Sequence, residues 1–121
     1  MQVNNKRMRV GEVIAKIGAE VLCCRDSLDK EISLVIASDL MSEVLTVNDD
    51  NILLVSGLSN LQLVRTAEML DIPAVIIVRG KDVTDEMIEL ASAKGIILAK
   101  STDSMFTVCG ILHDAGLISV S

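Results

Sequence analysis

The residues of this sequence with the clearest chemical potential are small hydroxyl side chains, a guanidinium and a carboxylate, all set in short polar turns. Hydroxyl groups, backbone N–H groups and an arginine are the groups with which proteins hold a phosphate or another anion, above all at the N-terminus of a helix. Together they could bind a nucleotide or another small anionic metabolite. The candidate ligand-binding residues are Ser38, Asp39, Ser56, Gly57, Ser59, Asn60, Arg79 and Thr102.

The same residue types have a second explanation that needs no ligand. Asn60 and Thr102 each precede a predicted helix and are preferred N-cap residues. Ser38 or Asp39 can cap another helix in the same way, and the carboxylate of Asp39 would repel an anion. A pocket and a row of helix caps therefore stand as alternatives. Substitution of Arg79 distinguishes them, because only a pocket would lose ligand affinity without a loss of stability.

Side chains that could catalyse a reaction are few. His113, the only histidine, falls in the last turn of a predicted helix, where an imidazole interacts with the terminal carbonyl groups. Cys109 lies on the apolar stripe of that helix and is interpreted as a core thiol. Cys23 and Cys24 are neighbours on a predicted strand, so their side chains point to opposite faces and cannot share one metal ion. We expect no catalytic residues, no metal and no cofactor.

The polar turns need elements that bring them together, and the sequence predicts strands that alternate with helices. Apolar runs without polar alternation predict strands buried on both faces over 34–37, 52–55, 74–78 and 96–99, after a helix before Gly18 and a strand over 19–24. A helix follows each of the four runs, with apolar positions at Leu40, Met41, Val44 and Leu45; Leu63, Val64, Ala67 and Leu70; Met87, Ile88 and Ala91; and Met105, Phe106, Cys109 and Leu112.

This alternation predicts an α/β fold, a three-layer α/β/α sandwich with a mostly parallel sheet, because strands joined through helices pair in parallel by right-handed crossovers. The N-terminal helix and strand are expected at one side of the sheet. Parallel strands end at one edge, so the polar turns should meet at the carboxyl edge, where ligands bind in open α/β sheets. With 121 residues the chain fits a single domain over 1–121.

The amino-acid composition indicates which classes of binding partner and which cellular compartment to expect. The chain has 11 Lys and Arg against 17 Asp and Glu, and a net charge of −6 disfavours a nucleic-acid partner. No apolar run approaches 18 residues, and the N-terminal segment has no signal-peptide pattern, so we expect no membrane partner. Three cysteines form no disulfide framework and favour a reducing compartment. The expected location is the cytoplasm.

Several segments resemble the DRTGG domain family, and together they span nearly the whole chain. They are Ile32 to Leu45 (ISLVIASDLMSEVL), the turn 56–60, the run 74–80, the segments 104–106 and 109–112, and the opening helix and strand over 10–22. One departure is clear. Asp29-Lys30-Glu31-Ile32-Ser33 stands where family members often have Asp-Arg-Thr-Gly-Gly, so the two glycines are replaced. A close backbone approach at those glycines is therefore not expected here.

The resemblance implies a non-catalytic module whose fold is similar to the N-terminal domain of HPr kinase/phosphorylase. Such modules lie between regulatory domains in some pyrophosphatases and beside the catalytic part of some phosphotransacetylases. Small stand-alone members are associated with iron-only hydrogenase systems. The sequence has no phosphate loop of the kinase type, so the resemblance does not imply kinase activity.

Two functions follow as expectations. The first is a non-catalytic regulatory or interaction module that self-associates as a homodimer, through an apolar helix surface or an open sheet edge, and contacts a protein partner. The alternative is a sensor that binds a nucleotide or another small anionic ligand at the carboxyl edge of the sheet. Neither function requires an enzyme.

Overall fold

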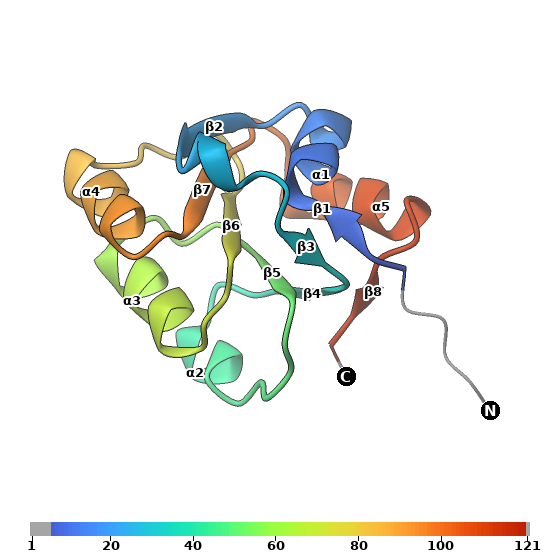
Figure 1. Cartoon of the computed structure of the whole chain (residues 1–121), viewed down its shortest axis with the longest axis horizontal. Helices are drawn as coiled ribbons and strands as arrows, with labels where there is room; N and C mark the ends of the chain where they lie inside the picture. The colour runs from blue at the N-terminus through green and yellow to red at the C-terminus, as the bar shows by residue number, and fades with distance from the viewer. Residues whose placement is uncertain (1–5, 121) are drawn as a thin grey trace.

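A computed structural model describes residues 6–120 and arranges them around a six-stranded sheet (Figure 1). The strand order is β2 (Glu20–Cys23), β7 (Ile97–Lys100), β6 (Ala74–Ile77), β5 (Ile52–Ser56), β4 (Leu34–Ala37) and β8 (Ile118–Ser119). All neighbouring strands pair in parallel except β2, which runs antiparallel to β7. The mostly parallel sheet is therefore confirmed, and the predicted strands are correct to within one or two residues at each end.

Helices cover both faces of this sheet (Figure 1). On one face lie α1 (Val10–Ile17) and α5 (Met105–Asp114), and on the other lie α2 (Met41–Val44), α3 (Leu61–Met69) and α4 (Asp85–Ala93). Alternate residues of a strand point to opposite faces, so Leu53 packs in the core beneath α1 and α5 and Leu54 in the core beneath α3 and α4. The three-layer α/β/α sandwich is confirmed.

Some short elements were not expected from the sequence. A two-stranded antiparallel sheet joins β1 (Met8–Arg9) to β3 (Glu31–Ile32), and a 3₁₀ turn spans Arg25–Ser27. The segment 25–31 therefore contains a helical turn and the first residue of a strand. The sheet also ends at β8, a strand of two residues that the sequence analysis did not predict.

The helix after β4 differs from its prediction. α2 has only four residues, and its N-cap is Leu40, so neither Ser38 nor Asp39 caps it. Met41 and Val44 are buried as predicted. Leu40 and Leu45, however, remain 58% and 44% exposed, because a single turn of helix cannot bury a longer apolar stripe.

The last helix, α5, also differs from its prediction. The N-cap of α5 is Ser104, whose hydroxyl accepts a hydrogen bond from the backbone N–H of Thr107, and Thr102 does not cap it. Val108 and Leu112 face the core, whereas Phe106, predicted as a core residue, is 88% exposed. The physical reason is that α5 carries apolar residues on nearly every side, so spacing alone did not identify the buried face.

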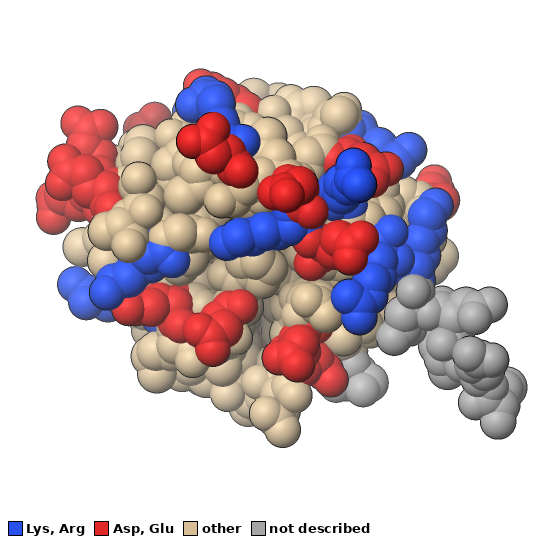
Figure 2. Space-filling view, viewed as in Figure 1, with Lys and Arg blue, Asp and Glu red and all other residues tan. Residues whose placement is uncertain are grey.

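The cap expected at Asn60 is confirmed, because its side chain accepts a hydrogen bond from the first turn of α3. Thr84 caps α4 in the same way, and Gly18 ends α1 in the left-handed conformation. Within residues 6–120, no helix has both the length and the apolar character needed to cross a membrane. Acidic and basic side chains are interspersed on the face shown in Figure 2.

Candidate functional site

The carboxyl edge of the sheet brings several predicted site residues into direct contact. Asp39, which follows β4, reaches across to the turn after β5, where its Oδ1 accepts hydrogen bonds from Gly57 N at 2.6 Å and from Ser56 Oγ at 3.4 Å. Its Oδ2 accepts a hydrogen bond from Arg79 Nη2 at 2.9 Å. One carboxylate thus links the ends of three neighbouring strands.

Arg79 is the cation of this cluster and is held in an unusual backbone conformation. Its φ is +68°, in the left-handed region that few side chains adopt, and its N–H donates to the carbonyl of Asp103 at 2.8 Å. Its guanidinium lies over Gly57, where a Cβ would clash with it. The side chains of Arg79 and Asp39 are each about half exposed, at 49% and 47%. An anion at Arg79 would therefore have to compete with Asp39.

Two further predicted residues stabilise their own turns. The hydroxyl of Ser59 donates to the carbonyl of Asp82, and the side chain of Asn60 accepts from Leu63 N at 3.2 Å. The first bond ties the turn after β5 to the segment before α4, and the second caps α3. In these two cases the observed contacts are those of loop and helix stabilisation.

Ser38 and Thr102 take no part in the hydrogen bonds that Asp39 makes with Ser56, Gly57 and Arg79. The hydroxyl of Ser38 accepts from Leu40 N at 3.0 Å, a local turn contact. Thr102 is exposed and stands two residues before the actual cap of α5, Ser104. The structure therefore unites Asp39, Ser56, Gly57 and Arg79 at the carboxyl edge and leaves the other predicted residues in separate contacts.

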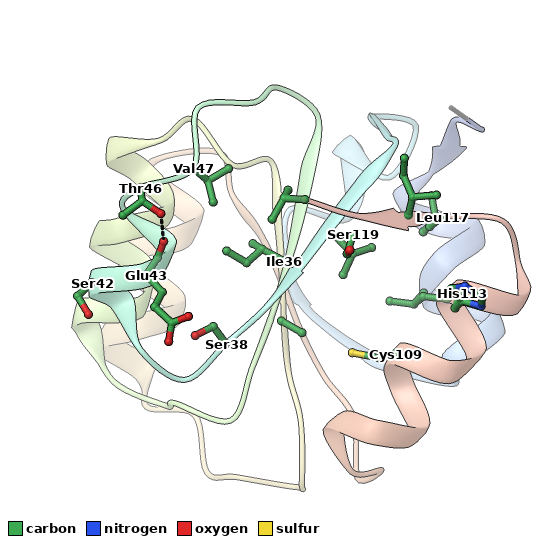
Figure 3. A pocket seen from close by; sticks show the side chains of 15 residues that line it. Ile36, Ser38, Ser42, Glu43, Thr46, Val47, Cys109, His113, Leu117 and Ser119 are labelled. Carbon is green, nitrogen blue, oxygen red and sulfur yellow. Dashed lines mark hydrogen bonds between the residues drawn. The ribbon is translucent and has the colours of Figure 1, made fainter. Parts of the chain in front are cut away.

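A cavity of about 610 Å³ lies elsewhere, at the open edge of β4 between α2 and α5 (Figure 3). It lies beside the edge of β4 that pairs with β8. The register of β8 with β4 ends at the pair Val35 and Ser119, so Ile36 and Ala37 have no β8 partner beside them. Of the predicted site residues, Ser38 alone is among the described residues that line this cavity.

The cavity has a mixed lining. Cys109, Leu112 and His113 of α5 line one wall, and the sulfur of Cys109 points toward the cavity in Figure 3. Glu43 and Thr46 belong to the opposite, more polar wall around α2, where the side chains of Glu43 and Ser38 point toward one another. Of the described lining residues, Glu43 alone is an acid, and none is a lysine or an arginine.

Cys109 and Cys23 each have a thiol with a raised pKa, which makes both of them poor nucleophiles. Burial raises the pKa of the Cys109 thiol, which keeps it protonated at neutral pH. Burial also raises the pKa of Cys23 to about 11, and its sulfur donates a hydrogen bond to the carbonyl of Ile96 at 3.3 Å. Residues 6–120 contain no cluster of three or more His, Cys, Asp or Glu side chains suited to a metal ion.

Sequence reasoning missed this cavity and the role of Glu43 and Cys109 in lining it. One signal was available. The C-terminal segment Ile118-Ser119-Val120 alternates apolar and polar residues, as an edge strand does. A strand there would have indicated that the far side of β4 is the edge of the sheet and only partly covered.

Comparison with solved structures gives a match that bears on the fold. No protein-family model matches the sequence, and no curated protein matches it either. The fold is similar to a crystal structure of the CBS and DRTGG domains of the regulatory region of Clostridium perfringens pyrophosphatase, complexed with its activator, diadenosine tetraphosphate. The TM-score is 0.70 with 16% sequence identity, over 86% of this chain and 45% of that one, so the chain spans about half the length of that structure. This likeness shows a fold of the kind found in that regulatory region.

Proposed function

We propose that the chain is a single non-catalytic regulatory or interaction domain of the DRTGG type, which acts in the cytoplasm and self-associates as a homodimer. The proposed bounds are 1–121, of which residues 1–5 and 121 lie outside the described residues. The similar solved structure belongs to a regulatory region, and this supports a regulatory role over a catalytic one. The sequence resemblance adds iron-only hydrogenase systems as the setting in which a protein partner is to be sought.

The observation that carries self-association is the outer face of α5. Phe106 is the only aromatic residue of the chain, and its side chain is 88% exposed. Gly110 follows one turn later on the same exposed face, and a Cβ at Gly110 would meet nothing within 4 Å. A glycine inside a helix costs about 1 kcal/mol relative to alanine. No packing within the described fold requires it.

A homodimer formed through α5 would explain why position 110 is a glycine. Two α5 helices that pack antiparallel about a twofold axis would each place Phe106 over Gly110 of the other helix, because a twofold interface repeats every contact. The missing side chain lets the ring approach the helix backbone closely. Burial of two aromatic rings is a favourable core for such an interface.

Sedimentation velocity over a range of micromolar concentrations tests the homodimer. We expect the wild-type chain to dimerise and Phe106→Glu to remain a monomer. Gly110→Leu should also be monomeric, although its isolated helix gains propensity and the monomer does not lose stability. Met69→Glu is the matched control, because Met69 is 70% exposed and lies on α3 in the other helical layer. A wild-type monomer at high micromolar concentration would refute self-association.

The anion sensor is the second candidate, and the conformation of Arg79 favours it. A non-glycine residue with φ of +68° and a half-exposed guanidinium is the kind of strained position found at functional sites. In this proposal a nucleotide displaces Asp39 and pairs with Arg79, with Ser56 and the turn after it as further contacts. ATP and diadenosine tetraphosphate should then raise the melting temperature of the wild type but not of Arg79→Ala. Identical shifts in both proteins would eliminate the carboxyl-edge site.

A further inference from the structure

The backbone of Ala37 is the first feature of the β4 cavity that points to a ligand. Ser38 N donates to Val55 O of β5, and Val120 N donates to Val35 O, so successive residues of β4 turn their backbone groups to opposite sides. By this alternation, the N–H and C=O of Ala37 face the side of β8, whose pairing with β4 ends, within the described residues, at Val35 and Ser119. An adjacent donor and acceptor therefore border the cavity.

The second feature is an apolar patch that faces polar groups. A flat apolar body would lie against Cys109 and Leu112, beside His113, while Glu43 and the hydroxyls of Ser38 and Thr46 lie on the other side (Figure 3). These oxygens accept hydrogen bonds from hydroxyl or amino groups. The volume of about 610 Å³ lies within the range of roughly 300–1,000 Å³ that is usual for small-molecule sites.

The third feature is charge. Among the described residues that line the cavity, Glu43 is the one carboxylate, His113 is the one basic side chain and none is a lysine or an arginine, so a phosphate would meet the charge of Glu43 without a guanidinium or ammonium group to pair with. This is the reverse of the expectation for the carboxyl edge, where Arg79 would attract an anion. The two sites therefore differ in the charge of the ligand that they favour, an anion at the carboxyl edge and an uncharged molecule in the cavity.

We propose that the β4 cavity binds a flat, uncharged heterocyclic metabolite with hydroxyl or amino donors and no phosphate, the chemical class to which nucleosides belong. The heterocycle packs against the wall formed by Cys109 and Leu112 and shares hydrogen bonds with the backbone of Ala37. Its hydroxyl groups donate to Glu43. The site is independent of the proposed α5 interface, since Phe106 and Gly110 do not line the cavity.

The experiment compares adenosine, AMP and ATP, which share a base and a sugar and differ in negative charge. Calorimetric titration should show that adenosine binds and that AMP binds about fivefold more weakly or worse. Location is read in two ways, from slower alkylation of Cys109 by N-ethylmaleimide and from a shift of the Ala37 amide signal in NMR spectra. Guanosine, cytidine and uridine complete the panel.

A pair of charge variants completes the test. Glu43→Lys, at an exposed position, should remove the preference for adenosine over AMP, whereas Glu89→Lys, on the exposed side of α4, should leave it unchanged. The proposal is overturned if all four nucleosides give neither heat nor a shift of Ala37 at millimolar concentration. It is also overturned if ATP binds more tightly than adenosine and leaves Cys109 unprotected, because that result assigns binding to Arg79.

Discussion

Asp39 holds the carboxyl edge together, and its contribution can be separated from that of Arg79. Asp39→Ala should lower the free energy of unfolding by about 1–3 kcal/mol, because the N–H of the buried Gly57 loses its acceptor. Arg79→Ala should cost less than about 1 kcal/mol, since the ion pair that it removes is half exposed and screened by water. Urea denaturation of both variants measures the difference. Equal losses would mean that the ion pair, rather than the bond to Gly57, is the main contribution.

Cys23 makes stability depend on alkaline pH. Its pKa rises from 9.0 to about 11 in the folded state through burial, so the folded chain keeps a proton that the unfolded chain loses. The resulting stabilisation is complete below pH 9 and is lost as the pH rises toward 11, with about 1 kcal/mol gone by pH 10. Urea denaturation at pH 8, 9 and 10 measures this slope. A Cys23→Ala variant with the same slope would assign it to other groups.

Among the elements, α5 offers a direct test of how a helix begins. Ser104→Ala should lower the free energy of unfolding by about 1 kcal/mol, because the hydroxyl of Ser104 accepts from Thr107 N. Thr102→Ala should change it by less than about 0.5 kcal/mol, since Thr102 is exposed and does not cap the helix. Thermal or urea denaturation of the two variants ranks them. The reverse order would show that the helix begins earlier in solution.

The elements that sequence reasoning predicted correctly are those with strong periodicity. Strands such as β5 and β6 are uninterrupted apolar runs, and α3 and α4 begin at standard capping residues. The strands β1, β3 and β8 have two residues each, too few to show a period, and only their pairing partners define them. The position of α5 in the chain was predicted correctly, but its buried face was not. Phe106 and Val108 fit equally well on an apolar stripe, and the structure buries Val108 and exposes Phe106.

The candidate site was predictable only in part, because side-chain geometry and strands of two residues leave no periodic pattern in the sequence. Strand polarity correctly indicated that Asp39, Ser56, Gly57 and Arg79 come together at one edge. That the carboxylate of Asp39 accepts from Arg79 depends on side-chain geometry, which the sequence pattern does not contain. The cavity lies between β4, α2, α5 and β8, and within the described residues β8 is a strand too short to recognise from the sequence.

At the scale of the whole molecule, the sheet is stable at its centre and weak at the β8 edge. All residues of β5 and β6 are buried, and each of these strands pairs on both sides. β8 pairs only with β4, through two residues that are both exposed. Amide protection follows burial and pairing, so local opening at β8 should need much less free energy than opening at the centre.

Hydrogen exchange followed by mass spectrometry tests this gradient and bears on the cavity. Amides of β6 should exchange slowest and those of β8 fastest among the six strands, because opening β8 breaks few bonds and exposes little apolar surface. Added adenosine should slow exchange in peptides that contain β4 and β8 while leaving β6 unchanged, because a ligand beside Ala37 stabilises only that edge. If β8 in the free chain exchanged as slowly as β6, the edge would already be covered in solution, and the cavity would not be open to a metabolite.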